Sequence, residues 1–361
     1  MRVLFNASAL PRRPAGAGIY TRELAAALAA RDDLELVTAA PGWAEIAGDE
    51  RVESPASGAF RRSLWEQAEL RSVLGDVSVY HGAHMATPLR AGVPRVATVH
   101  DLTFFRLSRR YSLRHRWYYR ALARTAARAE RIIVPSAAVA TDVVRHLGYA
   151  PERVRVISEA PRAGFRAASE GDVEAVRGRL GIEGPYLLCL GTAEPGKRAI
   201  DAIRAIALLR DMGHDTRLVL AGNPGRLSQA LAREVAHLRL EDRVLFAGYV
   251  PDGELPALIT GALALVYPSL YEGFGLPPLE AMACGTPVIT SRAPAMDEVL
   301  AGAAIFVPLG DPANVARAAA HLATDGAYRR EWIARGCEHV RRFSWERAAA
   351  ETTDVYRELA G

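Results

Sequence analysis

The chain has 361 residues, 50% of them hydrophobic and 24% charged, which suits two domains with substantial apolar cores. Its formal net charge of +4 is too small to indicate a nucleic-acid-binding protein, and no aromatic-basic recognition module is present. Cys189, Cys284 and Cys337 have neither disulfide-type nor metal-ligand spacing, so we expect a reducing, cytoplasmic setting.

Short apolar segments alternate with helical patterns through the first half of the chain. The first predicted strand starts directly after Met1, so we expect no signal peptide, and no apolar run approaches the ~20 residues that cross a bilayer. The expected strands are residues 3–6, 34–38, 77–81, 96–100, 132–135 and 154–157. The expected helices lie near residues 61–74, 111–129 and 136–147. Such alternation predicts a doubly wound parallel sheet.

Two features of this half lie just after predicted strands. Gly16 and Gly18 form a glycine-rich turn ahead of an amphipathic helix, and the backbone of such a turn can hold a phosphate or a sugar. Ordinary turn chemistry explains the same residues equally well. Thr21 replaces the third glycine of GxGxxG, which argues against a dinucleotide dehydrogenase. His100 ends a strand, where parallel sheets place their sites, although a purely structural histidine is as common there.

Nine arginines lie from residue 106 to residue 131, interleaved with Tyr111, Trp117, Tyr118 and Tyr119. The default interpretation is a solvated helix face. The second hypothesis is docking onto an anionic membrane surface or onto a pyrophosphate-linked acceptor.

A second alternating series follows a segment, residues 159–184, that contains Pro161, Gly164, Gly171 and Gly184. We place the domain boundary near the start of this segment, with domains at residues 1–165 and 166–343. The expected strands of the second domain are residues 186–191, 217–221, 244–247, 262–267, 288–291 and 304–307.

Lys197 is the only lysine among 45 lysine and arginine residues. The arginine bias, together with heavy alanine use, suggests a GC-rich genome, so the single lysine invites a local explanation. It lies between a predicted strand and a predicted helix at residues 199–209, at the carboxyl end of the second sheet. An ammonium group at that place can neutralise a diphosphate leaving group.

Residues 262–290 predict a buried strand, a turn, a helix and the start of another strand. Gly273 and Gly275 flank Phe274 in the turn, Pro277 suits a first helical turn, and Gly285 ends the helix.

Two carboxylates lie eight positions apart in this unit, with Glu272 on the loop and Glu280 near the helix start. A carboxylate accepts hydrogen bonds from two neighbouring hydroxyls, and the free N–H groups at a helix start attract anions. The pattern favours a ligand with a diol at each end and phosphate between. A Glu near a helix start is also common for purely structural reasons.

The run of residues 271–288 resembles the Glu-x7-Glu signature of the family 4 glycosyltransferases, which have the GT-B fold. The resemblance continues at Gly16–Thr21, at the strand-end His100-Asp101 and around Lys197, and covers nearly the whole chain. It implies two doubly wound Rossmann-like domains, of parallel-sheet α/β class, that face an interdomain cleft. It also implies that a helix at residues 344–361 packs back on the first domain.

The resemblance implies an enzyme that transfers a hexose, mannose favoured, from a nucleotide diphosphate sugar to an acceptor hydroxyl with retained configuration. No metal and no cofactor are expected. The acceptor would be a sugar or a lipid-linked sugar bound by the first domain, in surface polysaccharide or glycoconjugate synthesis, in the cytoplasm or at the inner face of the membrane. Because no carboxylate is an obvious nucleophile, we hypothesise front-face displacement.

The implied residue roles follow the motif match. Glu280 would hold the ribose, and Glu272 the donor sugar. Lys197 would bind the diphosphate, and His100 would lie by the sugar. Further donor contacts are expected from Gly16, Arg198, Gly273, Phe274, Gly275 and Leu276.

One departure leaves other functions open. The family's phosphate-binding arginine is Gly196 here, and Arg198 stands at the family's asparagine position, where it would compensate in part. Loss of one phosphate cation favours, as an alternative, a non-catalytic or altered nucleotide-sugar-binding protein. A nucleotide-sugar epimerase on the same fold is a further alternative.

Overall fold

The computed structural model describes the whole chain except residues 56–57, 71–73, 107–112 and 226. It divides the chain into two compact units, Met1–Arg162 with Phe343–Gly361 and Ala163–Arg342. The first boundary falls three residues earlier than predicted, and the return to the first unit falls one residue earlier. Within the described residues, no helix is long and apolar enough to cross a membrane.

The first unit is built on a seven-stranded parallel sheet in the order β3-β2-β1-β4-β5-β6-β7. Its strands are β1 (Arg2–Asn6), β2 (Glu35–Pro41), β3 (Glu50–Ser54), β4 (Val79–Gly82), β5 (Arg95–Thr98), β6 (Arg131–Val134) and β7 (Val154–Val156). Its helices are α1 (Ala17–Ala29), α2 (Ala59–Ala68), α3 (Thr103–Arg106), α4 (Leu113–Ala126), α5 (Ala137–Leu147) and α14 (Trp345–Ala360), with short 3-10 turns at Leu74–Asp76 and Pro151–Arg153.

The second unit contains a six-stranded parallel sheet in the order β10-β9-β8-β11-β12-β13. Its strands are β8 (Tyr186–Leu190), β9 (Arg217–Ala221), β10 (Val244–Gly248), β11 (Ala264–Tyr267), β12 (Val288–Ser291) and β13 (Ile305–Val307). Its helices are α6 (Glu170–Leu180), α7 (Ala199–Asp211), α8 (Ser228–His237), α9 (Leu255–Thr260), α10 (Leu276–Ala283), α11 (Pro294–Val299), α12 (Pro312–Thr324) and α13 (Gly326–Val340), with a 3-10 turn, η5, at Pro195–Lys197.

Strand order fixes where each unit can hold a site. In the first sheet the chain runs outward from β1 to β3, then restarts beside β1 at β4; in the second it runs from β8 to β10, then restarts at β11. The loops that leave the carboxyl ends of β1 and β4, and of β8 and β11, therefore diverge in opposite directions. Such switch points are where open parallel sheets bind their ligands.

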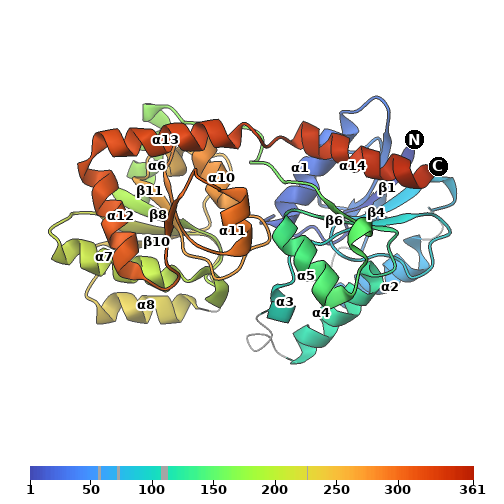
Figure 1. Cartoon of the computed structure of the whole chain (residues 1–361), viewed down its shortest axis with the longest axis horizontal. Helices are drawn as coiled ribbons and strands as arrows, with labels where there is room; N and C mark the ends of the chain where they lie inside the picture. The colour runs from blue at the N-terminus through green and yellow to red at the C-terminus, as the bar shows by residue number, and fades with distance from the viewer. Residues whose placement is uncertain (56–57, 71–73, 107–112, 226) are drawn as a thin grey trace. The chain divides into compact units, whose positions relative to one another are not determined.

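The C-terminal helix α14 belongs to the first unit and packs against α1 (Figure 1). Its Trp345 and Tyr356 are buried in one apolar cluster with residues of β1, α1 and β2. The indole Nε1 of Trp345 donates a hydrogen bond of 2.9 Å to the carbonyl of Pro161. Ser344 caps the helix by accepting a hydrogen bond from the Arg347 N–H, as expected of a serine at a helix start.

The predicted parallel α/β class is confirmed, and the strands of the second sheet agree with prediction to within two residues at each end. The sequence did not predict β3, which pairs only with β2 at the sheet edge and has a charged, mostly exposed sequence. In the first unit α2 ends at Ala68, and the rest of the predicted helix includes residues outside the described part. Residues 111–112 of another predicted helix also lie outside it, and α4 starts at Leu113.

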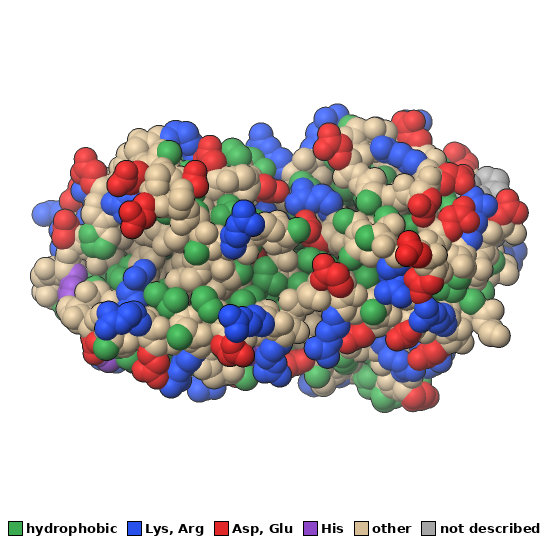
Figure 2. Space-filling view, turned by 90° about the horizontal axis from the view of Figure 1, so that it is seen from above, with side chains coloured by type: hydrophobic (Ala, Val, Ile, Leu, Met, Phe, Trp, Pro, Cys, Tyr) green, Lys and Arg blue, Asp and Glu red, His purple; other side chains and the backbone are tan. Residues whose placement is uncertain are grey.

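The solvent-facing charges are distributed in pairs rather than in blocks. On the face shown in Figure 2, basic and acidic side chains are interspersed over both units. Many are ion pairs along a helix, such as Arg347–Glu351 at 2.9 Å on α14. The net charge of +4 therefore does not arise from one single-sign surface on this face.

Candidate functional site

The loop between β11 and α10 has the strand-turn-helix form that its sequence predicts. Gly275 precedes the helix with φ of 108°, a value that side-chain-bearing residues rarely adopt. A Cβ at this position would also lie 2.4 Å from the Cε of Met296. Pro277 and Pro278 occupy the first helical turn, and Phe274 and Leu276 are buried. The backbone conformation thus favours glycine at position 275, and any side chain there would also displace the end of Met296.

Lys197 and Glu272, predicted to contact the same ligand, lie in contact with each other. The Lys197 Nζ donates to Glu272 Oε1 at 2.6 Å and to the hydroxyl of Tyr267 at 2.8 Å. The two loops are joined by a backbone hydrogen bond of 2.8 Å from Leu270 N–H to the Gly196 carbonyl. The switch point between β8 and β11 therefore brings together residues 75 positions apart.

The electrostatics of this contact favour a charged lysine. Burial works against the charge of the Lys197 ammonium, but the attraction of Glu272 and the hydrogen bonds to Glu272 and Tyr267 outweigh it, so the pKa of Lys197 is raised. Burial also raises the pKa of Tyr267, and the nearby Glu272 acts in the same direction. Lys197 is therefore cationic and Tyr267 is a neutral phenol at physiological pH.

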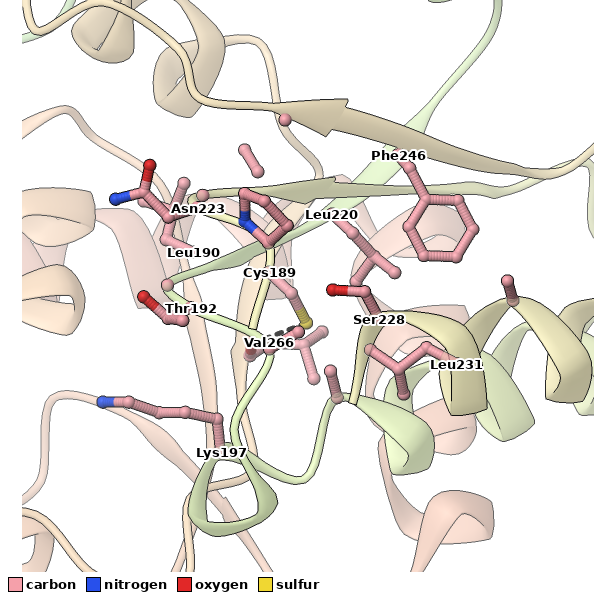
Figure 3. A pocket seen from close by; sticks show the side chains of 18 of the residues that line it. Cys189, Leu190, Thr192, Lys197, Leu220, Asn223, Ser228, Leu231, Phe246 and Val266 are labelled. Atoms are coloured by element: carbon pink, nitrogen blue, oxygen red, sulfur yellow. Dashed lines mark hydrogen bonds between the residues drawn. The ribbon is translucent and has the colours of Figure 1, made fainter. Parts of the chain in front are cut away.

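A pocket of about 450 Å³ opens beside Lys197 at the carboxyl ends of β8, β9, β10 and β11 (Figure 3). In that view Lys197 lies at one end of the labelled side chains and Phe246 at the other. The walls of this pocket are largely apolar, with a few polar side chains, namely Thr192, Asn223, Ser228 and Gln229. An apolar cavity of this size with few polar groups is typical of small-molecule sites.

Close backbone contacts form part of this pocket. A Cβ at Gly222, where φ is 145°, would lie 2.3 Å from the Gly191 carbonyl oxygen, and one at Gly225 would lie 2.4 Å from that of Ala193. The loops after β8 and β9 can therefore approach each other only because both positions are glycine.

Of the donor contacts predicted in this unit, only Lys197 lines that pocket. Glu280 lies within α10 and is 1% exposed. Arg198, in a left-handed conformation with φ of 49°, binds both carboxylate oxygens of the buried Asp201 at 2.6 and 2.8 Å. Asp201 takes two of the five N–H groups of the Arg198 guanidinium, so the predicted phosphate contact would have to come from the others. The ribose contact of Glu280 stays a prediction. Gly273, beside Glu272, likewise stays a predicted donor contact.

The remaining predicted residues, His100 and Gly16, belong to the first unit. The His100 Nε2 donates to the Ala83 carbonyl at 3.0 Å, and Nδ1 lies 3.1 Å from the buried carboxyl of Glu159. Both ring nitrogens thus have partners, and contact with a sugar hydroxyl would require exchanging one of them. Gly16 precedes α1 with φ of 47° and has open space around its Cα.

A smaller pocket of about 150 Å³ lies at the other switch point, between the loops after β1 and β4. It is lined by Asn6, Leu10, Gly18, Thr21 and His84, among others. Burial, with a smaller contribution from His100, lowers the pKa of His84 to about 4, so its imidazole is neutral at pH 7.

Sequence reasoning missed several of these residues. Tyr267 could have been predicted from the sequence, because it is the last residue of a central strand and parallel sheets place their sites at the carboxyl ends of the strands. Glu159, Phe246 and His84 carry no motif. Only the tertiary fold brings Phe246 to the larger pocket, and Glu159 and His84 next to His100. Across the described residues, no group of three or more His, Cys, Asp or Glu could hold a metal ion, and all three cysteines are free.

Comparison with known proteins identifies the class. The family described as Glycosyltransferase Family 4 matches residues 14–160, and that described as Glycosyl transferases group 1 matches residues 172–339. Anabaena HepE in complex with UDP-glucose has the same fold, with a TM-score of 0.79 and 20% identity over 99% of this chain and all of that one. Sucrose-phosphate synthase from Thermosynechococcus elongatus has the same fold, with a TM-score of 0.80 and 22% identity over 99% of this chain and 98% of that one. The two Rossmann-like units thus form a GT-B fold.

Curated relatives place the chain more closely. O-antigen chain mannosyltransferase B of Escherichia coli is 31% identical over 83% of this chain and 78% of that protein. MMP alpha-(1->4)-mannosyltransferase of Mycolicibacterium hassiacum is 31% identical over 78% of this chain and 71% of that protein. D-inositol 3-phosphate glycosyltransferase of Streptomyces bingchenggensis is 32% identical over 64% of this chain, which spans only 53% of it. The protein belongs to the family 4 glycosyltransferases.

Proposed function

We propose that the protein transfers a hexose, with mannose favoured, from a nucleotide diphosphate sugar to an acceptor hydroxyl in surface polysaccharide or glycoconjugate synthesis. The observation that carries this proposal is the site of the second unit, where Lys197, in contact with Glu272, lines an apolar pocket at a switch point. A nucleoside fits the pocket chemistry, a diphosphate fits the ammonium of Lys197, and a sugar diol fits a carboxylate.

Two relatives favour mannose as the sugar, because both are named as mannosyltransferases and each is 31% identical to this chain. The O-antigen relative also favours a polysaccharide product. HepE was solved with UDP-glucose, which supports a nucleotide sugar as donor without selecting the base.

In the proposed mechanism the configuration of the sugar is retained and no metal or cofactor takes part. Lys197 would stabilise the negative charge that develops on the departing diphosphate. Glu272 would orient the sugar, since its carboxylate is committed to hydrogen bonding rather than placed as a nucleophile. The acceptor hydroxyl would attack from the face that the phosphate leaves, and a phosphate oxygen would take its proton. We propose that Glu280, Arg198, His100 and Gly16 complete the donor contacts.

The first experiment is a thermal-shift screen of the full chain against GDP, UDP, ADP and dTDP sugars, since a bound ligand raises the melting temperature by mass action. The sugar that binds is then offered with a panel of saccharide and lipid-linked acceptors, and the product is analysed by NMR. A product of inverted anomeric configuration contradicts the retaining mechanism. Conversion of the nucleotide sugar with no acceptor present would indicate an epimerase, and binding without any transfer would indicate a binding protein.

We further propose that the first unit contacts an anionic membrane surface and that the protein acts at the cytoplasmic side. Four large apolar side chains are exposed on α2, α4 and the loop after β4, namely Phe60 (77%), Leu64 (55%), Leu89 (53%) and Trp117 (71%). Exposed arginines, Arg61, Arg120 and Arg124, accompany them on the same two helices. The helices are linked by a hydrogen bond of 3.4 Å between Arg62 and Tyr118.

Apolar side chains beside arginines fit a surface of anionic lipid. We expect stronger binding to vesicles that contain anionic lipid than to neutral vesicles, and a loss of that preference in Trp117→Ala. Met212→Ala, which removes a 50% exposed side chain of the second unit, is the matched control. Equal binding to both kinds of vesicle contradicts this proposal. Tyr111 and Arg109, which belong to the same arginine-rich segment, lie outside the described residues.

A further inference from the structure

Lys197 is held on two sides before any ligand arrives. Its ammonium donates to Glu272 at 2.6 Å and to the Tyr267 hydroxyl at 2.8 Å, and it lies 5.0 Å from the centre of the Tyr267 ring. Tyr267 is 3% exposed, and the side chain of Glu272 is 13% exposed. The Lys197 side chain is itself 34% exposed and lines the pocket. The cation therefore faces the pocket while its charge is already balanced.

This balance changes what an incoming anion must do. A phosphate that binds Lys197 competes with a carboxylate in direct contact with the same ammonium. If the phosphate draws the ammonium away, Glu272 loses its charged partner while most of its side chain stays covered by protein. Leaving a mostly covered charge without a partner is costly, and much of the effect of breaking such a pair comes from that charge.

A nucleotide sugar and a free nucleoside diphosphate differ in whether they offer Glu272 a new partner in place of the ammonium. Both bring phosphates to Lys197 and a ribose, but only the nucleotide sugar also brings the hydroxyls of the hexose beyond the phosphates, which can donate hydrogen bonds to Glu272. Glu272 would then exchange an ammonium partner for sugar hydroxyls, whereas the diphosphate product leaves the carboxylate with neither.

We propose that the Lys197–Glu272 pair makes the site discriminate against the free nucleoside diphosphate, so that the product is released while the nucleotide sugar is retained. The inference deepens the proposed function and rests on it. Tyr267 is the positioning residue, because its hydroxyl and its ring keep the ammonium beside Glu272 in the empty site.

The simpler view treats Glu272 only as a ligand of the sugar. In that view, neutralising Glu272 weakens nucleotide-sugar binding and leaves the affinity for a diphosphate unchanged. The proposed discrimination predicts a different result, since removal of the carboxylate frees Lys197 for phosphate.

The test measures dissociation constants by calorimetry for the full chain and for Glu272→Gln. The probes are inorganic pyrophosphate, GDP and UDP, together with GDP-mannose and UDP-glucose. We expect Glu272→Gln to bind pyrophosphate and the recognised nucleoside diphosphate on the order of ten-fold more tightly. The affinity for the matching nucleotide sugar should not rise in parallel, so the preference for the sugar falls by a similar factor.

Two further variants separate local from general effects. Glu183→Gln removes the same charge from an 81% exposed side chain just before the amino end of β8, whereas the pocket lies at the carboxyl ends of the strands. This variant should leave pyrophosphate binding unchanged. The double variant Lys197→Ala, Glu272→Gln should not show the tighter binding of pyrophosphate that is expected of Glu272→Gln alone.

The outcomes distinguish the inference from the function. If the wild-type chain binds a nucleotide sugar and Glu272→Gln binds the diphosphate no more tightly, the discrimination is refuted and the proposed function stands. An equal gain in Glu183→Gln also refutes it, because the effect is then one of net charge. If the wild-type chain binds none of the GDP, UDP, ADP and dTDP sugars of the thermal-shift screen, the proposed function fails, and this inference fails with it.

Discussion

The Nδ1 atom of His81 lies 2.5 Å from the hydroxyl oxygen of Tyr356, although the two residues are 275 positions apart in the chain. The other ring nitrogen of His81 lies 2.8 Å from the Thr98 hydroxyl, which in turn lies 2.9 Å from that of Tyr20. All four side chains are buried. This network ties α14 to β4, β5 and α1, so the last helix of the chain is part of the core of the first unit.

The network predicts acid sensitivity. Burial, with a smaller effect of His100, lowers the pKa of His81 from 6.5 to about 3, so the native state does not bind a proton that the unfolded state binds below pH 6.5. Stability should therefore fall as pH falls from 6.5 towards 5, by about 1.4 kcal/mol per pH unit for each such histidine. His84, with a pKa of about 4, acts in the same direction.

The measurement is the melting temperature of the wild-type chain and of His81→Gln between pH 7.5 and pH 5. The variant should show a shallower decline, because one of the two neutral histidines is gone. A wild-type melting temperature that does not change over this range contradicts the prediction.

Replacing the tryptophan that begins α14 should destabilise the first unit. Trp345 is 7% exposed, donates to the Pro161 carbonyl and packs edge-to-face on Tyr20 with ring centroids 5.9 Å apart. Trp345→Ala should cost about 3–5 kcal/mol of unfolding free energy, as large-to-small core changes do. Arg347→Ala, on the exposed face of the same helix, should cost less than about 1 kcal/mol. Denaturant unfolding measures both, and equal effects would show that the buried indole is not what holds the helix.

Lys197→Ala should abolish sugar transfer, because the leaving diphosphate loses its ammonium partner. The raised pKa of Lys197 further predicts that wild-type activity does not decline through deprotonation of this residue up to pH 10. Steady-state rates against pH test both statements, with the melting temperature of the variant as a control for folding. Unchanged turnover in Lys197→Ala would remove this residue from the mechanism.

Phe246 is expected to stack on the nucleotide base. It lines the pocket at the opposite end from Lys197 in Figure 3 and is 44% exposed, which is unusual for a large aromatic ring. Aromatic stacking on a base contributes about 1–3 kcal/mol, so Phe246→Ala should weaken nucleoside diphosphate binding by roughly 10- to 100-fold. Tyr249→Ala changes a similarly exposed aromatic residue that does not line the pocket, and its affinity should match the wild type. Equal losses in both variants would argue against stacking by Phe246.

The sequence was sufficient for those parts of the fold that depend on local pattern. The apolar runs of β8 and β11 and the glycine and proline positions around α10 predict where elements begin and end. The charged strand β3 escaped prediction because it lies at an edge and pairs only with β2. The contact between His81 and Tyr356 was not predicted either, because no local sequence pattern relates two residues that lie 275 positions apart.

Of the candidate site, the sequence predicted Lys197 and Glu272 but not their direct contact, and it missed Tyr267 and Phe246. Lys197 and Glu272 were both selected for a shared ligand, yet their direct contact depends on β8 and β11 being neighbours, which strand order decides. His100 was selected from its strand end, but the partners of its two ring nitrogens, Glu159 and Ala83, come from other loops. Tertiary neighbours of this kind are set by topology rather than by spacing.

Having just one lysine makes this chain unusually simple to label and to cut. Lys197 carries the only side-chain amine, so an acylating reagent that reacts with side-chain amines has a single target, which lines the pocket of the second unit. A protease specific for lysine likewise has one cleavage site, between η5 and α7. The extent of acylation or cutting with and without nucleotide would therefore report directly on occupancy of that pocket.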